Sequence, residues 1–487
     1  MISNSSLKEL IEPHFHKSLV SKNYSTREID AADLLTNSRL DIAFKLLFLE
    51  LYDLNQEYAV EIYSEHLRAA TAGTYTEFGN SDKNSLDKFI KIFLQIHESL
   101  QNGFNNKTSL IPVSENGSIL NGSHRIASAI FLNKKVCSVT IKHPPEIQNY
   151  EFFLKRGVDV WLIEKAVNKF IEHSKNAYLA IIWPSAEGSE LRKESINMFP
   201  NVIYRKDIEF TPNGGKNLIT QVYKGEEWVG STKDNFKGAL NKAAWCFSGS
   251  NNLATVIAFQ SKSLSSVIKI KEEIRDLFRI DKHSIHITDS SLEAVALSKM
   301  LFNDNSIHFL NHANLCKYLS TERKFKTLAM CVENTKLNKG EFLVDGSFVL
   351  EMYGIRESQD IDVITIQNNE LSETCVNIDK RDSHLKYHHI NKTDLVFNDK
   401  YSFPYNGVKF VSFMQLYQMK KNRGEKKDYN DLKLMSAYTA SDKLTFYKQK
   451  VKSYVLFSLI KLKIKIMSFM IKVGIYKYIR PIYKKIF

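Results

Sequence analysis

Cysteine is scarce in this sequence: five cysteines stand among 487 residues, at positions 137, 246, 316, 331 and 375. No two of them have the CxxC spacing that is typical of zinc sites and redox motifs. The scatter therefore predicts reduced thiols and no disulfide framework. Residues 1–19 are polar and mixed in charge and lack the apolar core of a signal peptide, so we expect a cytoplasmic protein.

Acidic residues are missing from the stretch 443–487, which holds twelve Lys or Arg. Removing these twelve charges from the formal +13 leaves a net charge of +1 for the rest of the chain. Lysines interrupt the apolar residues too often for a membrane-spanning helix, which needs about 20 mostly apolar residues. The composition favours a tail that lies on an anionic membrane surface, peripheral at the inner face of the membrane. A basic tail can also bind nucleic acid, but the near-neutral body argues against that partner.

The length of the chain predicts several domains. At about 100 to 200 residues per domain, the sequence makes about three of them. Patterns of apolar residues predict an α/β and α+β multidomain protein. The expected parts are a helical lead-in with a first domain at 1–145, a central α/β domain at 150–320, a third domain at 325–440 and a basic amphipathic tail at 443–487.

A motif with two aspartates organises the third of these domains. It has an apolar strand at 341–344, the turn Asp345-Gly346-Ser347, a short helix at 348–353 and a β-branched strand at 361–366. Asp360 and Asp362 share one face because they are two residues apart on a strand. Two such carboxylates can hold Mg²⁺ against the phosphates of a nucleotide. The turn at Gly346 and Ser347 offers backbone N–H groups and a hydroxyl to the same phosphates.

This stretch resembles the core motif of the DNA polymerase β-type nucleotidyltransferase superfamily, Gly-Ser followed by a short helix and Ser-x-Asp-Ile-Asp. The segment from Gln415 to Asp431, with Lys420, is similar to the helix that often follows in small bacterial members. The resemblance covers roughly residues 325–440. It implies a third carboxylate from a later strand, for which Asp394 within 393–397 is the candidate. It also implies that nucleotide phosphates are contacted by Gly346, Ser347, Arg356, Ser358 and Lys420.

A second motif lies near the end of the first domain. Residues 109–113 and 119–121 are predicted to form a β-hairpin with an Asn-Gly turn. A helix is predicted to begin directly after Gly122. Glycine lets the backbone approach an anion, and the N-terminus of a helix presents unpaired N–H groups. His124 and Arg125 add charge-assisted donors at that point, so the residues predict a phosphate site.

The run Asn121-Gly122-Ser123-His124-Arg125 closely resembles the Asp-Gly-x-His-Arg motif of the ParB and sulfiredoxin superfamily, over roughly residues 60–145. Sulfiredoxin has a cysteine where this chain has Ser123, and the second Arg-rich box of ParB clamps is missing. What remains similar is the free amino-acid kinase branch, which uses this fold to transfer phosphate. That resemblance implies a nucleotide site at residues 121–125 and makes Glu77 a candidate general base. The simpler interpretation of Glu77 is an ordinary glutamate in a loop.

The central region alternates β-branched runs with helical stretches, which predicts a mostly parallel sheet. Its strand candidates are 178–183, 202–204, 254–259 and 284–288. A cluster of His283, His286 and Asp289 surrounds the last strand and could serve in acid–base or nucleophilic chemistry. Buried, hydrogen-bonded histidines are the alternative, because no metal-ligand spacing is met.

Together these patterns predict a Mg²⁺-dependent nucleotidyl- or phosphotransferase that uses ATP or another NTP. The acceptor would be a sugar-phosphate or lipid-linked precursor of bacterial surface polysaccharide, an assignment that depends on analogy and on the tail. The alternatives are a ParB-like kinase with a non-catalytic nucleotidyltransferase fold, a nucleic-acid-binding protein with a basic tail, and a regulatory scaffold that binds nucleotide without turnover.

Overall fold

A computed structural model describes residues 1–77, 82–335, 340–366, 375 and 377–439, together with Ile466, Phe469, Met470 and Val473. The chain forms two compact units. The first comprises Met1–Ala313, Asn338–Leu343 and Lys392–Phe410, and the second comprises Asn314–Leu337, Val344–Asn391 and Val411–Phe487. Apart from those four single residues, the predicted membrane-surface tail at 443–487 lies outside the described residues.

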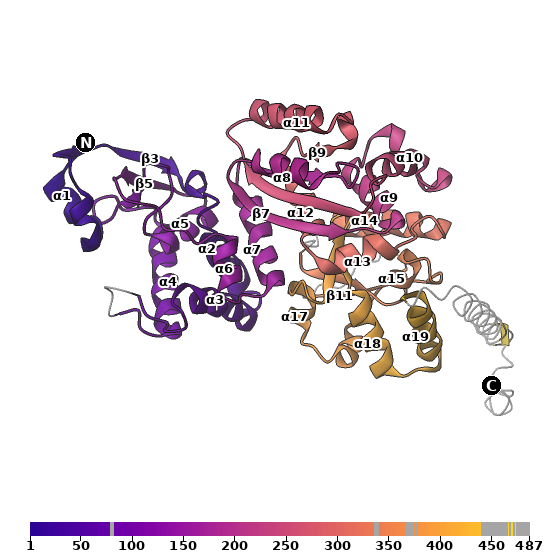
Figure 1. Cartoon of the computed structure of the whole chain (residues 1–487). Helices are drawn as coiled ribbons and strands as arrows, with labels where there is room; N and C mark the ends of the chain where they lie inside the picture. The colour runs from indigo at the N-terminus through magenta and orange to yellow at the C-terminus, as the bar shows by residue number, and fades with distance from the viewer. Residues whose placement is uncertain are drawn as a thin grey trace. The chain divides into compact units, whose positions relative to one another are not determined.

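The N-terminal part of the first unit combines helices with a small mixed sheet (Figure 1). Its order is β3-β5-β4; β3 pairs with β5 antiparallel, and β4 pairs with β5 parallel. Of the expected hairpin over 109–113 and 119–121, the structure forms β4 and one isolated antiparallel bridge between Val113 and Ile119. The elements are β1 (Ile2–Ser3), α1 (Asn4–Lys8), β2 (Asn23–Tyr24), β3 (Thr26–Asp30), α2 (Asp41–Tyr52), α3 (Gln56–Ala70), α4 (Leu86–Gln101), β4 (Ile111–Val113), α5 (Ser123–Phe131) and β5 (Lys135–Thr140).

The central part of the first unit is built on a four-stranded sheet of order β7-β8-β6-β9. Its elements are α6 (Tyr150–Lys155), α7 (Val160–His173), β6 (Ala177–Ile182), α8 (Ser189–Asn197), β7 (Val202–Glu209), α9 (Pro212–Val222), α10 (Lys237–Cys246), β8 (Leu253–Gln260), α11 (Leu264–Phe278), β9 (Ile285–Ile287), α12 (Ser291–Leu301) and α13 (Asp304–His312). Val267, Ile270 and Ile274 of α11 pack on the sheet in one apolar core with Ile257 and Phe259 of β8.

The prediction of a mostly parallel sheet in this region was wrong. β6 pairs antiparallel with both β8 and β9, and β7 pairs antiparallel with β8. The four expected strands are present, but β8 lies between β6 and β7 in the sheet. Of the strands that follow one another in the sequence, β7 and β8 are neighbours, whereas β6 and β7, and β8 and β9, are not. The alternation of strands and helices did not reveal the strand directions.

The remaining elements carry the two-aspartate motif and the segment C-terminal to it. They are α14 (Leu319–Thr335), β10 (Phe342–Asp345), α15 (Ser347–Met352), β11 (Ile361–Thr365), β12 (Ile378–Lys380), α16 (Leu385–His388), α17 (Lys392–Phe397), β13 (Ser402–Tyr405), β14 (Val408–Val411), α18 (Phe413–Arg423) and α19 (Lys426–Thr439). The five strands form one sheet of order β12-β11-β10-β14-β13. The expected strand–turn–helix–strand pattern is thus confirmed as β10, Gly346, α15 and β11.

Two cysteines correct the expectation of reduced thiols throughout. Cys331 on α14 and Cys375 form a disulfide with a sequence separation of 44 residues. Cys137, Cys246 and Cys316 form no disulfide bond among the described residues. The bond joins positions whose proximity depends on the fold, so sequence spacing alone did not indicate it.

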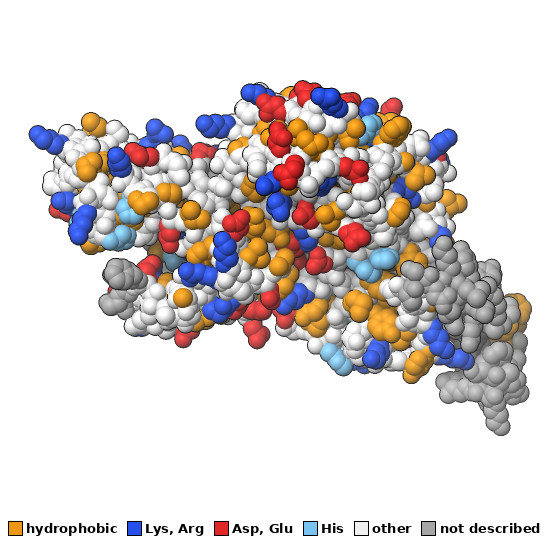
Figure 2. Space-filling model, in the orientation of Figure 1, with side chains coloured by type: hydrophobic (Ala, Val, Ile, Leu, Met, Phe, Trp, Pro, Cys, Tyr) orange, Lys and Arg blue, Asp and Glu red, His pale blue; other side chains and the backbone are white. Residues whose placement is uncertain are grey.

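Two further observations bear on membranes and on polyanionic partners. Among the described residues, no helix combines the length and apolar character needed to cross a membrane. Figure 2 shows basic and acidic side chains interspersed over the visible face, in keeping with the near-neutral charge of the chain outside its tail.

Candidate functional site

The turn between β10 and α15 brings the two parts of the two-aspartate motif together. Gly346 is the N-cap of α15 and has a φ of +73°, a conformation that side-chain-bearing residues rarely adopt. A Cβ atom at this position would overlap the carboxylate of Asp362 on β11. The glycine is therefore needed for its backbone angle and for the close approach of Asp362. Ser347, the first residue of α15, is partly exposed.

Pairing of β11 with β12 supplies a third carboxylate. The two strands are parallel, and their register places Asp379 directly beside Asp362. Carboxylate oxygens of Asp360, Asp362 and Asp379 all lie within 4.8 Å of one another. Asp360 and Asp379 are partly or largely exposed, whereas Asp362 is mostly buried. Carboxylate oxygens are the ligands that Mg²⁺ prefers, so these residues fit that ion.

Arg381 lies across the three carboxylates. Its Nε donates to Asp362 Oδ1 at 2.8 Å, and its Nη2 donates to Asp379 Oδ2 at 2.8 Å and lies 3.6 Å from Asp360 Oδ2. Burial and the neighbouring charge of Asp360 raise the pKa of Asp362 to about 6 in spite of this guanidinium. Carboxylates so close together repel one another, and a cation between them removes that repulsion.

The expected third carboxylate, Asp394, is not part of this cluster. Residues 393–397 form part of helix α17 instead of a strand, and Asp394 belongs to the first unit. Its Oδ1 accepts a hydrogen bond of 2.9 Å from Asn55 Nδ2. Asp379 takes the place that the sequence analysis gave to Asp394. The signal for it was the short apolar-polar run Ile378-Asp379-Lys380, which becomes informative once it is known to pair with β11.

Two cations that were expected to face phosphates are held by acids in the interior of the second unit. Arg356 makes a two-pronged contact with Asp431, with N–O distances of 2.6 and 2.8 Å. Lys420 donates to the same carboxylate at 2.8 Å, and both Lys420 and Asp431 are buried. Burial by itself would raise the pKa of Asp431, but these two cations hold it below its usual range. Arg356 and Lys420 therefore stabilise the packing of α18 and α19.

Ser358 also has an internal role. Its backbone N–H and its hydroxyl both donate to the buried carboxylate of Glu351, at 2.7 and 2.8 Å. Lys324 completes the cluster by pairing with Glu351 and donating to Ser358 Oγ at 2.8 Å. Of the predicted nucleotide-contacting residues in this unit, Gly346 and Ser347 lie at the carboxylates, whereas Arg356, Ser358 and Lys420 are engaged elsewhere.

The second predicted site, in the first unit, keeps its expected backbone. Helix α5 begins at Ser123, directly after Gly122, whose φ is +91°. Arg125 folds back over that glycine, close enough for a Cβ there to overlap its guanidinium. The guanidinium donates to Glu12 Oε1 at 3.0 Å and also contacts Ser109. An incoming phosphate would compete with Glu12 for Arg125.

His124 does not supply the expected charged donor. Its ring is buried, and its Nε2 shares a hydrogen bond of 2.7 Å with Tyr63 Oη. Burial, reinforced by nearby Lys45 and Lys83, holds the pKa of His124 well below its usual value, so the ring is neutral at pH 7. Glu77, the candidate general base, forms an ion pair of 2.8 Å with Lys83.

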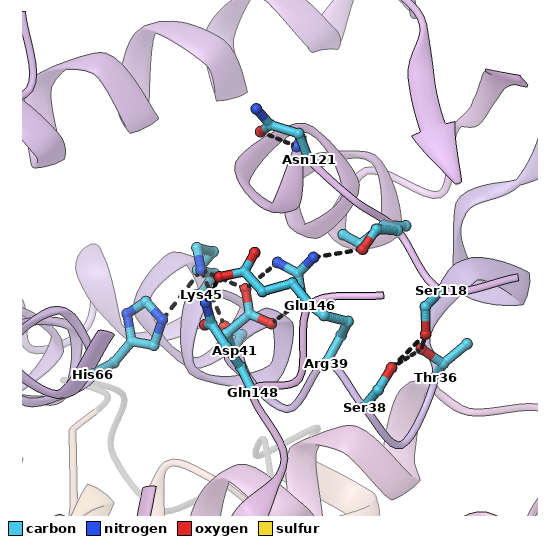
Figure 3. A network of polar contacts seen from close by, with 12 residues as sticks. Thr36, Ser38, Arg39, Asp41, Lys45, His66, Ser118, Asn121, Glu146 and Gln148 are labelled. Carbon is cyan, nitrogen blue, oxygen red and sulfur yellow. Dashed lines mark hydrogen bonds and ion pairs between the residues drawn. The ribbon is translucent and has the colours of Figure 1, made fainter. Parts of the chain in front are cut away.

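A buried polar network lies beside this region (Figure 3). Asp41 accepts two hydrogen bonds from Arg39, at 2.8 and 2.9 Å, and one of 3.0 Å from Lys45. Lys45 also lies 3.2 Å from His66 Nε2. Asn121 stands apart in this view and bonds the backbone N–H of Gly122. The network ties α2 to α3 and is structural, because Arg39, Asp41, Lys45 and His66 are all buried.

The histidine cluster of the central region is divided among separate partners. His286 Nε2 lies 3.0 Å from Glu293 Oε1, and its side chain is buried. Glu293 also accepts from the backbone N–H of Asp289. His283 stacks on Trp245 and contacts Lys242. This arrangement agrees with the alternative of hydrogen-bonded structural histidines.

The carboxylate cluster of the second unit is therefore the candidate site with the most coherent geometry. It combines three acidic side chains, a glycine turn in contact with one of them, and an arginine that spans all three. A search against protein-family models, curated proteins and solved structures found no match.

Proposed function

We propose that the second unit is a Mg²⁺-dependent nucleotidyl- or phosphotransferase. The observation that carries this proposal is the cluster of Asp360, Asp362 and Asp379 beside the turn at Gly346 and Ser347. Bound Mg²⁺ would neutralise phosphate charge and orient the phosphorus for in-line attack. The three carboxylates would hold the ion, with ATP or another NTP as the donor.

The roles of the surrounding residues depend on their exposure and bonding. Asp362 is the most buried of the three carboxylates and lies against the Gly346 turn, so it would be the most rigid metal ligand. Asp379 is half-exposed at the outer strand, where it could accept a proton from an acceptor hydroxyl. The N–H groups and hydroxyl at the start of α15 would receive the phosphate oxygens.

Arg381 would change partners when metal and nucleotide bind. It neutralises the carboxylates through two hydrogen bonds of 2.8 Å and one longer contact. A divalent cation at the same oxygens would release the guanidinium, which could then offset charge on the nucleotide phosphates. The acceptor class in this proposal is a sugar-phosphate or lipid-linked precursor, and membrane attachment through the basic tail would bring the enzyme to it.

The test is turnover of NTPs by the full-length chain with Mg²⁺ in a bacterial small-molecule extract, read by mass spectrometry. We expect a new nucleotidyl or phosphoryl adduct that disappears with Asp360→Ala and with Asp379→Asn. Arg125→Ala, at the turn in the first unit, should leave the adduct unchanged. Loss of the product only in Arg125→Ala would move the chemistry to the first unit and refute the proposal. Absence of turnover with every NTP would refute it as well.

A further inference from the structure

A cavity of about 240 Å³ lies wholly within the first unit and is separate from the carboxylate cluster. Helices α2, α7 and α12, the two residues before β10, the end of α17 and strands β13 and β14 contribute to its walls. Leu47, Leu51 and Phe397 give it apolar surface. A single water needs only about 10 to 15 Å³ of such space, so the cavity has room for a small metabolite.

Lys409 of β14 reaches this cavity with an incompletely neutralised charge. Its ammonium donates to the main-chain carbonyls of Gly340 and Val396, both at 3.0 Å. Both acceptors are neutral, and an ammonium has three N–H donors. Burial lowers the pKa of Lys409 to about 8, although the charge of Asp399 opposes this effect. An anion in the cavity would accept the third N–H and balance the charge.

The other lysines at the cavity already have carboxylate partners. Lys165 pairs with Asp399 at 3.1 Å. Lys169 pairs with Glu172 at 2.8 Å and with Glu50. Lys299 also lines the cavity and lies 3.7 Å from Glu172. Because these three lysines have acidic partners, a negative group on a ligand would be recognised chiefly by Lys409.

Asn168 of α7 gives an independent indication of a ligand. It lines the cavity, and only 9% of its surface is exposed. Its Oδ1 atom is buried and has no hydrogen-bond partner among the described residues. Buried polar atoms are nearly always bonded. Because almost none of the Oδ1 surface is accessible, a donor in the cavity would bond this atom after the amide turns toward the cavity. A hydroxyl or amino group would be such a donor.

We infer that this cavity binds a small anion that also carries a hydroxyl or amino group. The anionic group would contact Lys409, the donor group would contact Asn168, and a short carbon skeleton would lie against Leu47, Leu51 and Phe397. Phosphorylated sugars and hydroxy or amino acids share this chemistry. The site does not depend on the proposed transferase activity, since none of its residues belongs to the carboxylate cluster.

The experiment is a thermal-shift and calorimetric titration of the full chain with glycerol 3-phosphate, glucose 6-phosphate, malate and serine, with inorganic phosphate and sodium chloride at matched ionic strength as references. We expect one of the four metabolites to bind saturably, and its class separates a phosphate from a carboxylate as the recognised group. Lys409→Met and Asn168→Leu should each weaken that binding at least tenfold. Lys193→Met, an exposed lysine on α8, is the matched control and should bind as the wild type does.

Lys409→Met is expected to fold, because it removes a partly buried charge and keeps an unbranched side chain of similar length. If it does not, Asn168→Leu decides the question, since it replaces the amide by an apolar group of similar size and removes no charge. The inference is overturned if none of the four metabolites binds saturably. It is also overturned if binding is equally strong in the wild type and in every soluble cavity variant.

Discussion

Gly346 and Asp362 are in such close contact that the smallest side chain at position 346 would overlap the Asp362 carboxylate. The glycine is also held at a φ of +73°, so any other residue there is strained as well as crowded. We therefore expect Gly346→Ala to displace Asp362 and to lower the affinity of the second unit for Mn²⁺, a spectroscopic substitute for Mg²⁺, at least tenfold. Electron paramagnetic resonance of Mn²⁺ in a titration measures this directly.

Gly424→Ala is the matched control for that substitution. Gly424 ends α18 with a φ of +63°, but only the side chain of Tyr429 and the carbonyl of Lys421 approach a Cβ there, at 3.7 and 4.0 Å. The variant should cost about 1 kcal/mol of stability through backbone strain and leave Mn²⁺ binding unchanged. Unchanged Mn²⁺ affinity in Gly346→Ala would show that the turn does not position the metal ligands.

The identity of the third carboxylate is testable with a pair of conservative variants. We expect Asp379→Asn to weaken Mn²⁺ binding at least tenfold, because Asp379 is paired beside Asp362 and its oxygen lies in the cluster. Asp394→Asn should leave binding unchanged, because Asp394 bonds Asn55 in the first unit. Calorimetry measures both affinities. If Asp394→Asn weakens Mn²⁺ binding and Asp379→Asn does not, the third carboxylate is Asp394, as the sequence predicted.

Asp379 and Asp394 show how much of the candidate site could be predicted from the sequence. The turn, the helix α15 and the Asp-x-Asp strand were predictable because each depends on neighbours within a few residues. Asp379 was not, since its place beside Asp362 depends on parallel pairing of β11 with β12 across an intervening segment. The same limit explains Arg356 and Lys420: their residue types suit phosphate, but their partner Asp431 is 75 positions from Arg356.

The buried network around Asp41 predicts a large effect on stability. Asp41 lies between Arg39 and Lys45, and only 1% of its side chain is exposed. Burial alone would raise the pKa of Asp41, but the two cations outweigh it and hold the pKa well below its usual range. Asp41→Ala would leave two buried cations without their acid and should cost about 3 to 5 kcal/mol in urea unfolding. Asp30→Ala, at an exposed ion pair with Lys175, is the control and should cost far less.

The neutral state of His124 makes the first unit sensitive to acid. Burial keeps the folded-state pKa of His124 well below 6.5, and Lys45, Lys83 and His66 add to the effect while Asp41 opposes it. The unfolded chain therefore binds more protons, and stability is full above pH 6.5 and falls as the pH drops below it. The loss is up to about 1.4 kcal/mol per pH unit for this histidine.

His124→Gln tests that assignment, because glutamine can still bond Tyr63 and does not titrate. We expect the difference in unfolding free energy between pH 7.5 and pH 5.5 to be smaller in His124→Gln than in the wild type. Equal pH dependence in the two proteins would mean that folding does not lower the pKa of His124, which would reopen its role as a charged phosphate ligand.

The disulfide between Cys331 and Cys375 gives the last prediction. It closes a loop of 44 residues that contains β10, α15 and β11, so the chain-entropy relation gives it about 4 kcal/mol of stabilisation. Under denaturing conditions the untreated chain should show three reactive thiols, from Cys137, Cys246 and Cys316, and five after dithiothreitol. Reduction should lower the urea midpoint of the second unit, and Cys331→Ser should reproduce that loss without reductant.

Cys137→Ser, which removes a free thiol, should respond to dithiothreitol as the wild type does, because its disulfide is intact. Five reactive thiols before any reductant would instead support the reduced state that the scattered cysteines first suggested.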